Sequence, residues 1–149
     1  SGRTQEIQRL IGRSLRACVD LEKMTDVTIT IDADVIQADG GTRCASICGG
    51  FVAMQDAIKK LLDNGTLTEN PIREPLAAVS AGIVEGEIRL DLEYEEDSHA
   101  DVDSNIVLTK SGNIVEFQTT AEGHTLTKQQ MDEIFDLAQE GINKIILLY

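Results

Sequence analysis

The stretch that most constrains the fold is the glycine-rich sequence 39–46, which stands between two different hydrophobic patterns. Residues 27–35 alternate apolar and polar side chains, as a half-buried strand does. Residues 45–62 carry apolar side chains at helical spacing. Gly40 and Gly41 let the backbone turn sharply and approach a ligand closely. The sequence therefore predicts a tight turn that leads from a strand into a helix.

This turn carries the groups that bind an anion. The first backbone N–H groups of a helix have no partner within the helix, and the helix start carries partial positive charge. Arg43 adds a planar guanidinium that can hold phosphate through two hydrogen bonds, while Thr42 and Ser46 add hydroxyl groups. An ordinary capped turn without a ligand is the alternative, and the spacing alone leaves both open. A Walker A loop is excluded, because no lysine follows the glycines at the required spacing.

Composition limits the classes of protein and partner. The 149 residues suffice for one domain with a hydrophobic core, and the three cysteines, an odd number, argue against a disulfide framework and fit a cytoplasmic location. No apolar run approaches the roughly 20 residues that cross a bilayer, so no membrane partner is expected. The formal net charge of −13 argues against non-specific nucleic-acid binding through overall charge. A local basic site stays open, because Arg9, Arg13 and Arg16 share one face of the first predicted helix, although these residues alone favour a solvated basic face.

Helix and strand patterns follow one another along the chain and predict an α+β domain. The first helix is expected over residues 4–21, and the last begins at Thr127, where Gln130 completes a capping box. Short turns predict two hairpins. Their strands are expected over residues 76–84 and 87–92, and over residues 105–109 and 114–118.

The stretch 91–105 concentrates acidic side chains between two predicted strands. Crowded carboxylates repel one another unless a positive group lies between them, and oxygen ligands favour Mg²⁺ or Mn²⁺. An EF-hand is excluded, because Ile106 and Gly112 occupy the positions of its required glycine and glutamate. A solvated acidic loop is the alternative. Phosphate-binding groups combined with a carboxylate metal site are what phosphoryl transfer needs.

Three segments at consistent spacing resemble ribonuclease PH: residues 1–16, 37–43 and 91–105. The resemblance implies the ribonuclease PH-like α+β architecture, a ribosomal-protein-domain-like βα sandwich of mixed sheets with flanking helices. The family's chain is longer at the N-terminus, so residues 1–149 are interpreted as its truncated, C-terminal part. Residues 1–70 would be the remainder of the first βα half with the phosphate turn, and residues 76–149 the second half with the catalytic aspartates.

The same resemblance implies a phosphorolytic 3′-to-5′ exoribonuclease, a tRNA nucleotidyltransferase that trims tRNA precursor 3′ ends. Inorganic phosphate is the co-substrate and nucleoside diphosphates are released. A cytoplasmic enzyme that forms a homo-oligomeric, hexameric ring (a trimer of dimers) is expected. The alternative is a catalytically inactive, RNA-binding structural subunit of such a ring, or an inactive fragment of the enzyme.

The resemblance also assigns roles to individual residues. Asp97 and Asp103 would be the catalytic carboxylates and would hold a divalent metal, Mg²⁺ or Mn²⁺. Arg9 and Arg13 would either lie near the RNA end or help to structure the phosphate site. The attacking phosphate would be bound by residues at the start of the first helix and in the turn, namely Arg3, Gly41, Thr42, Arg43 and Ser46.

Overall fold

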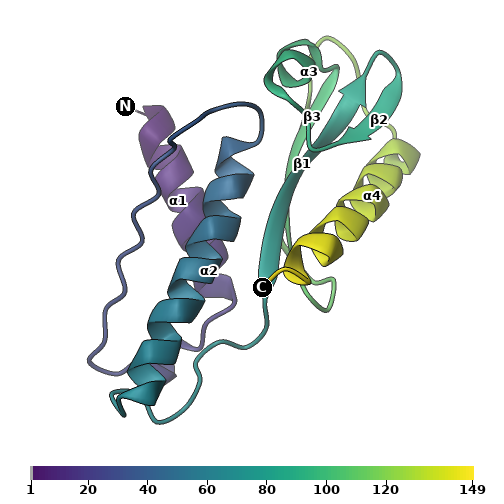
Figure 1. Ribbon diagram of the computed structural model, residues 1–149. Coiled ribbons are helices and arrows are strands. Elements are labelled where there is room, and N and C mark those ends of the chain that lie inside the picture. The colour runs from purple at the N-terminus through teal and green to yellow at the C-terminus, as the bar shows by residue number, and fades with distance from the viewer. Residues whose placement is uncertain (1) are drawn as a thin grey trace.

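The computed structural model describes residues 2–149 and has the predicted α+β class (Figure 1). Ser1, the first residue of the resemblance to ribonuclease PH, lies outside the described residues. None of the helices in the described range is long and apolar enough to span a membrane. The elements in chain order are α1 (Gly2–Ala17), the 3₁₀ helix η1 (Leu21–Lys23), α2 (Thr42–Asp63), β1 (Leu76–Val84), β2 (Glu87–Leu90), α3 (Tyr94–His99), β3 (Val102–Thr109), β4 (Ile114–Ala121) and α4 (Lys128–Ile146).

The four strands form one antiparallel sheet in the order β2-β1-β3-β4. Both predicted hairpins are confirmed. The β1–β2 turn places Glu85 and Gly86 at φ angles of 52° and 79°, the left-handed region that two-residue hairpin turns use. Every residue of β1, at the centre of the sheet, is buried.

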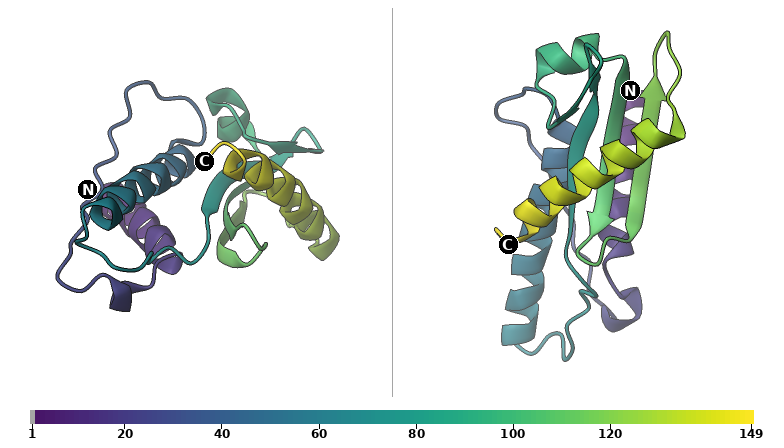
Figure 2. Two further views of the ribbon diagram at one scale, coloured as in Figure 1. Left: turned by 60° about the horizontal axis from the view of Figure 1, so that its bottom comes forward. Right: turned by 90° about the vertical axis from the view of Figure 1, so that its right-hand side faces the viewer.

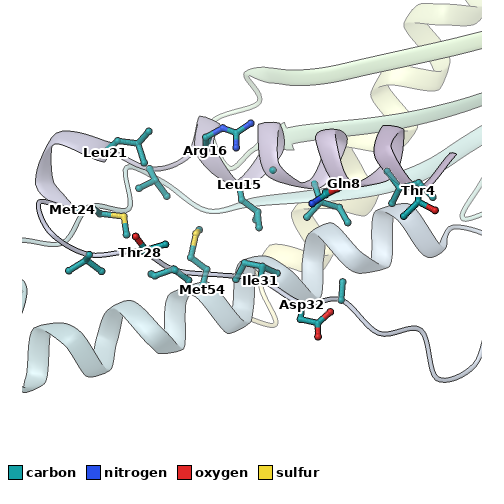
Figure 3. A pocket seen from close by; sticks show the side chains of 17 residues that line it. Thr4, Gln8, Leu15, Arg16, Leu21, Met24, Thr28, Ile31, Asp32 and Met54 are labelled. Carbon is teal, nitrogen blue, oxygen red and sulfur yellow. The ribbon is translucent and has the colours of Figure 1, made fainter. Parts of the chain in front are cut away.

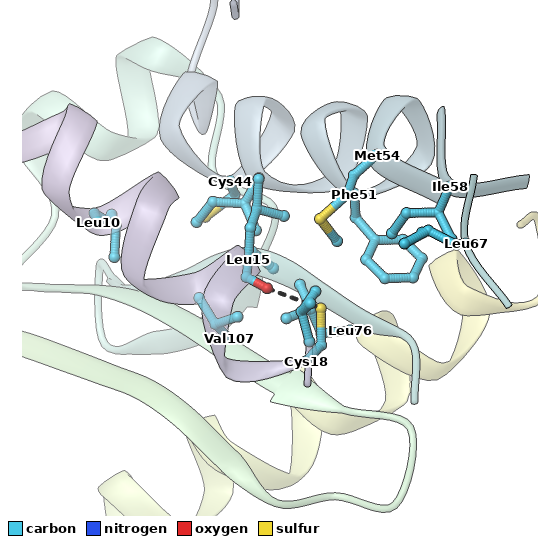
Figure 4. Close-up of a cluster of buried hydrophobic side chains, with 13 residues drawn as sticks. Leu10, Leu15, Cys18, Cys44, Phe51, Met54, Ile58, Leu67, Leu76 and Val107 are labelled. Carbon is cyan, nitrogen blue, oxygen red and sulfur yellow. Dashed lines mark hydrogen bonds between the residues drawn. The ribbon is translucent and has the colours of Figure 1, made fainter. Parts of the chain in front are cut away.

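Helices cover both faces of the sheet (Figure 2). The pair α1 and α2 packs on one face, and α4 crosses the other. The first face forms a core around Phe51, which is fully buried among side chains of α1, α2, β1 and β3 (Figure 4). The second core lies under α4, where Ile134 and Ile142 pack against β1 and β3. Because β1 is buried on both faces, its sequence is nearly continuous in apolar residues.

The strand predicted over residues 27–35 is not formed. Val27, Ile29 and Ile31 are partly buried against the core beside α1 and α2, which explains their alternation. Within residues 2–149 no strand lies beside this segment to pair with its backbone. The segment instead borders a groove of about 820 Å³, into which Leu15, Ile31 and Met54 point from three parts of the chain (Figure 3). The alternation of apolar and polar residues in this segment therefore reflects burial of one of its sides, without pairing in a sheet.

The predicted capping box at the start of α4 is confirmed, and it supports a stability prediction. The Thr127 hydroxyl accepts the Gln130 N–H at 3.1 Å, and the Gln130 side chain accepts the Thr127 N–H at 3.0 Å. We expect Thr127→Ala to lower the free energy of unfolding by about 1 kcal/mol, measured by urea denaturation. Thr66→Ala, at an exposed loop position, is the control and should change stability by less than about 0.5 kcal/mol. Equal losses in both variants would contradict the role of the cap.

Candidate active site

One face of the sheet changes from apolar to polar along β1 and β3. The two antiparallel strands place Ala78 opposite Val107, Ser80 opposite Asn105, and Gly82 opposite Asp103. Alternate residues of a strand share a face, so all three rows face α2. Ala78 and Val107 belong to the core, whereas Ser80, Asn105 and Asp103 line a cavity of about 170 Å³. The strand register therefore sets these polar groups at the end of the hydrophobic core.

The glycine turn closes this cavity from the side of α2. Gly41 is the N-cap residue of α2, has a φ of 72°, and supplies no capping side chain. The first N–H groups of α2 are therefore left for another acceptor. Gly40 packs directly on the backbone that leads to α3, where a Cβ would collide with the Leu92 carbonyl oxygen. Both glycines are thus required by the turn, one for its backbone angle and one for close approach.

Asp39 ties the turn to the start of α3. One carboxylate oxygen accepts the N–H of Tyr94 at 2.7 Å and the N–H of Gly40 at 2.8 Å. These two hydrogen bonds hold the pKa of Asp39 below its usual value, and the one from Tyr94 has the larger effect. The ionised carboxylate therefore links two segments that are far apart in sequence. Sequence analysis placed Asp39 in the turn and assigned it no role.

The acidic stretch forms a short helix, α3, which the sequence analysis did not predict. Its start is stabilised by a capping box, in which the Glu96 carboxylate accepts the Glu93 N–H at 3.2 Å. Arg89 of β2 pairs with Glu96 at 2.7 Å and keeps the pKa of Glu96 low. This pair fixes α3 against the sheet and so positions Asp97. His99, at the end of α3, is exposed and is not among the residues that line the cavity.

Asp97 of α3 meets Asp103 of β3 inside the cavity. The pKa of Asp103 is raised to about 6 by burial, and further by the negative charge of Asp97 and a hydrogen bond between the two side chains. The Arg43 guanidinium acts in the opposite direction and lowers this pKa. Two carboxylates this close share a proton or a cation, because both cannot ionise freely.

Two arginines bring positive charge to the same cavity. Arg43 follows the turn, its side chain is 26% exposed, and it pairs with Glu6 of α1 at 3.0 Å. Arg3 lines the cavity from the first turn of α1. The starts of α1 and α2 therefore meet at one site, which places cations and the α2 N-terminus opposite the carboxylates.

The structure brings together six of the predicted site residues and leaves three outside the cavity. The hydroxyl of Ser46 donates to the carbonyl oxygen of Thr42 within α2 at 2.8 Å. Arg9 and Arg13 line a separate pocket of about 320 Å³ between α1 and β4, where Arg13 pairs with Glu116 at 2.9 Å. The residues that line the cavity as expected are Arg3, Gly41, Thr42, Arg43, Asp97 and Asp103.

Besides Asp39, sequence analysis assigned no role to three further residues that line the cavity: Ser80, Tyr94 and Asn105. Asn105 lies two residues after Asp103 on a strand, so period-two alternation alone places it on the same face. Its side-chain oxygen accepts the Cys44 thiol at 3.4 Å, and burial raises the pKa of that thiol to about 12. Tyr94 lies three residues before Asp97, a spacing that has meaning only once α3 is known to be a helix.

The carboxylate pair also fits a hard divalent cation. Among residues 2–149, no three His, Cys, Asp or Glu side chains converge as in a dedicated metal centre. Mg²⁺, however, is commonly held by one or two carboxylates together with substrate phosphates and water. Asp97 and Asp103, beside a turn suited to phosphate, present this donor set.

The raised pKa of Asp103 makes stability depend on pH. The folded state binds this proton more tightly than the unfolded state, so the associated stability is present below about pH 4 and is lost as the pH rises through 6. We expect Asp103→Asn to be more stable than the wild type by about 1–2 kcal/mol at pH 7.5 and equal to it at pH 4. Urea denaturation in EDTA at both pH values tests this. A difference that does not change with pH would contradict it.

Comparison with known proteins identifies the family to which the chain belongs. Two profiles of one family match the sequence: "3′ exoribonuclease family, domain 1" over residues 1–60, and "3′ exoribonuclease family, domain 2" over residues 74–141. The chain belongs to the 3′ exoribonuclease family. The resemblance to ribonuclease PH is thereby confirmed, and the arginines and aspartates of the cavity come from both matched regions.

Individual relatives agree with this family. Ribonuclease PH of Neisseria gonorrhoeae is 60% identical over 146 residues, which are 98% of this chain and 60% of that protein. Ribonuclease PH of Crocosphaera subtropica is 53% identical over 148 residues, which are 99% of this chain and 62% of that protein. The chain thus spans about three fifths of the length of these relatives. A solved Archaeoglobus fulgidus exosome with RNA bound to the active site shares the fold, with a TM-score of 0.68, 23% identity, and coverage of 96% of this chain and 60% of that one.

Proposed function

We propose that this 3′ exoribonuclease family member is a phosphorolytic 3′-to-5′ exoribonuclease that uses inorganic phosphate and releases nucleoside diphosphates. The observation that carries the proposal is one polar cavity that joins an anion site to a pair of carboxylates. The anion site consists of Arg3, Arg43 and the uncapped start of α2. The names of the similar full-length proteins, ribonuclease PH, support the same activity.

The anion site explains how phosphate acts as the nucleophile. An oxygen of inorganic phosphate attacks the phosphorus of the last phosphodiester, the bond from phosphorus to the 3′ oxygen breaks, and the shortened RNA keeps a 3′ hydroxyl. Two phosphate groups repel each other, so their approach requires fixed positive charge. Arg3 and Arg43 supply that charge, and the backbone N–H groups at the start of α2 orient the attacking phosphate.

The carboxylates act on the leaving group. The raised pKa of Asp103 lets this side chain hold a proton near neutral pH, and we assign it the transfer of that proton to the departing 3′ oxygen. Asp97 keeps the pKa of Asp103 raised through its charge and hydrogen bond. Asp97 and Asp103 would also hold Mg²⁺ or Mn²⁺, which when bound neutralises negative charge on the phosphate oxygens.

We further propose a substrate, an assembly and a cellular location from the similarity to ribonuclease PH. The substrate would be the 3′ end of tRNA precursors, the full-length protein would assemble as a hexameric ring, and the location would be cytoplasmic. The exosome with RNA bound to its active site supports an RNA substrate for this fold. Residues 1–70 would act as the half that binds phosphate, and residues 76–149 as the half that carries the catalytic aspartates. An inactive ring subunit has less support, because Arg43, Asp97 and Asp103 all remain in one cavity.

The dependence on phosphate tests the activity. The protein is incubated with a 3′-extended RNA and Mg²⁺, with orthophosphate or with sulfate at the same ionic strength. We expect nucleoside diphosphates in phosphate alone, and extension of the RNA with release of orthophosphate when nucleoside diphosphates are supplied. Nucleoside monophosphates formed without phosphate would mean hydrolysis and would contradict the proposal. No product in either buffer would favour the inactive subunit.

A further inference from the structure

The chain has five aromatic residues, three Phe and two Tyr, and four of them pack in pairs. The rings of Phe51 and Tyr149 stack at 5.0 Å, and those of Phe117 and Phe135 lie 6.2 Å apart. Tyr94 is the fifth and is 67% exposed. Packing in the core therefore does not explain the presence of an aromatic ring at this position.

Tyr94 lies at the candidate active site. It lines the cavity and is placed three residues before Asp97, so both side chains share one face of α3. Its backbone N–H is held by the Asp39 carboxylate at 2.7 Å. The same carboxylate binds Gly40 of the turn, so the position of the tyrosine is fixed relative to the anion site.

The size and polarity of the cavity leave a nucleobase outside it. Its volume of about 170 Å³ is small beside the roughly 300–1,000 Å³ of pockets that enclose a drug-sized ligand. The other residues that line it are glycine, charged or polar. The cavity can therefore take the reacting phosphate groups, while a base attached to them must lie at the rim, where Tyr94 offers the one aromatic face among the lining residues.

We propose that Tyr94 is a stacking platform for the base of the 3′-terminal nucleotide. This inference rests on the proposed function, because it assumes a single-stranded RNA 3′ end at the cavity. Stacking on an aromatic ring tolerates every base, since each has a π face. The platform thus positions the terminal nucleotide of single-stranded RNA without selecting its sequence.

The test uses a short single-stranded RNA with fluorescent 2-aminopurine at its 3′ end, in EDTA and without phosphate so that the RNA stays intact. Stacking on Tyr94 should quench the fluorescence on binding. We expect Tyr94→Ala to remove the quenching and weaken binding about 5- to 100-fold, and Tyr94→Phe to restore both. With an RNA whose terminal base is missing, Tyr94→Ala should cost less than about 3-fold. Leu147→Ala removes an apolar side chain that is 83% exposed and lies outside the cavity, so it is the control and should bind like the wild type.

The results with Tyr94→Ala distinguish the failure of this inference from the failure of the proposed function. Quenching and binding that are unchanged in Tyr94→Ala would overturn the stacking role and leave phosphorolysis standing. An equal loss with and without the terminal base would also overturn it. Quenching that depends on Tyr94 in a protein that shows no phosphorolysis would support the platform while the proposed function fails. Absence of RNA binding by the wild type would overturn both.

Discussion

Replacing Asp103 with asparagine should lower kcat for phosphorolysis by about 10²- to 10⁴-fold, because the variant can no longer donate a proton to the leaving 3′ oxygen. The amide keeps the size and much of the hydrogen bonding of the carboxylic acid, so the cavity should stay intact. The anion site is formed by other residues, and we therefore expect the affinity for phosphate to change by less than about 3-fold. Steady-state kinetics and calorimetric titration with phosphate measure the two effects.

Asp101 offers a matched control for this substitution. It lies two residues before Asp103, is partly exposed, and pairs with His124 at 3.6 Å outside the cavity. Asp101→Asn removes the same charge from the same stretch of chain and should leave kcat within about 2-fold of the wild type. Activity of Asp103→Asn within about 10-fold of the wild type would rule out Asp103 as the proton donor.

Replacing Arg43 with alanine should weaken the binding of phosphate by about 10²-fold or more. The guanidinium can form two charge-assisted hydrogen bonds to one phosphate, and each such bond contributes about 1.5–3 kcal/mol. Arg43→Lys keeps the charge and loses the planar fork, so its affinity for phosphate should fall between those of the wild type and Arg43→Ala. The affinity is measured by calorimetry and by the KM for phosphate at saturating RNA.

The loss of one positive charge must be separated from the loss of this arginine. Arg73 lies outside the cavity, and its side chain is 62% exposed in a long ion pair with Asp20 at 3.9 Å. Arg73→Ala therefore controls for net charge and should bind phosphate as the wild type does. Similar losses in the two variants would show that overall charge, and not the turn, governs phosphate binding.

The parts of the fold that depend on local sequence were predicted well. Both hairpins and the capping box at Thr127 follow from neighbouring residues, and the structure contains them. The turn at Gly40 and Gly41 was also predicted, because its glycines and Arg43 stand together in the sequence. The resemblance to ribonuclease PH then named Asp97 and Asp103, which the structure places in the same cavity as Arg43.

The features that were missed depend on contacts between distant segments. Helix α3 is held by Arg89 of β2, and six residues rich in acid give no helical periodicity of their own. Residues 27–35 alternate apolar and polar side chains as a strand does, and this periodicity predicted a strand. No neighbouring strand in the described range pairs with their backbone, so the strand does not form. The link from Asp39 to Tyr94 joins two stretches whose proximity only the fold reveals.

The central claim is that inorganic phosphate is the nucleophile and is bound where Arg43 and the start of α2 meet the carboxylates. The most direct measurement supplies radiolabelled orthophosphate with unlabelled 3′-extended RNA and follows the label. The account predicts that the label appears in the β-phosphate of the released nucleoside diphosphates, and that Arg43→Ala raises the concentration of phosphate needed for half-maximal incorporation by about 10²-fold or more. Nucleotides released without label, or incorporation by Arg43→Ala with the phosphate dependence of the wild type, would contradict it.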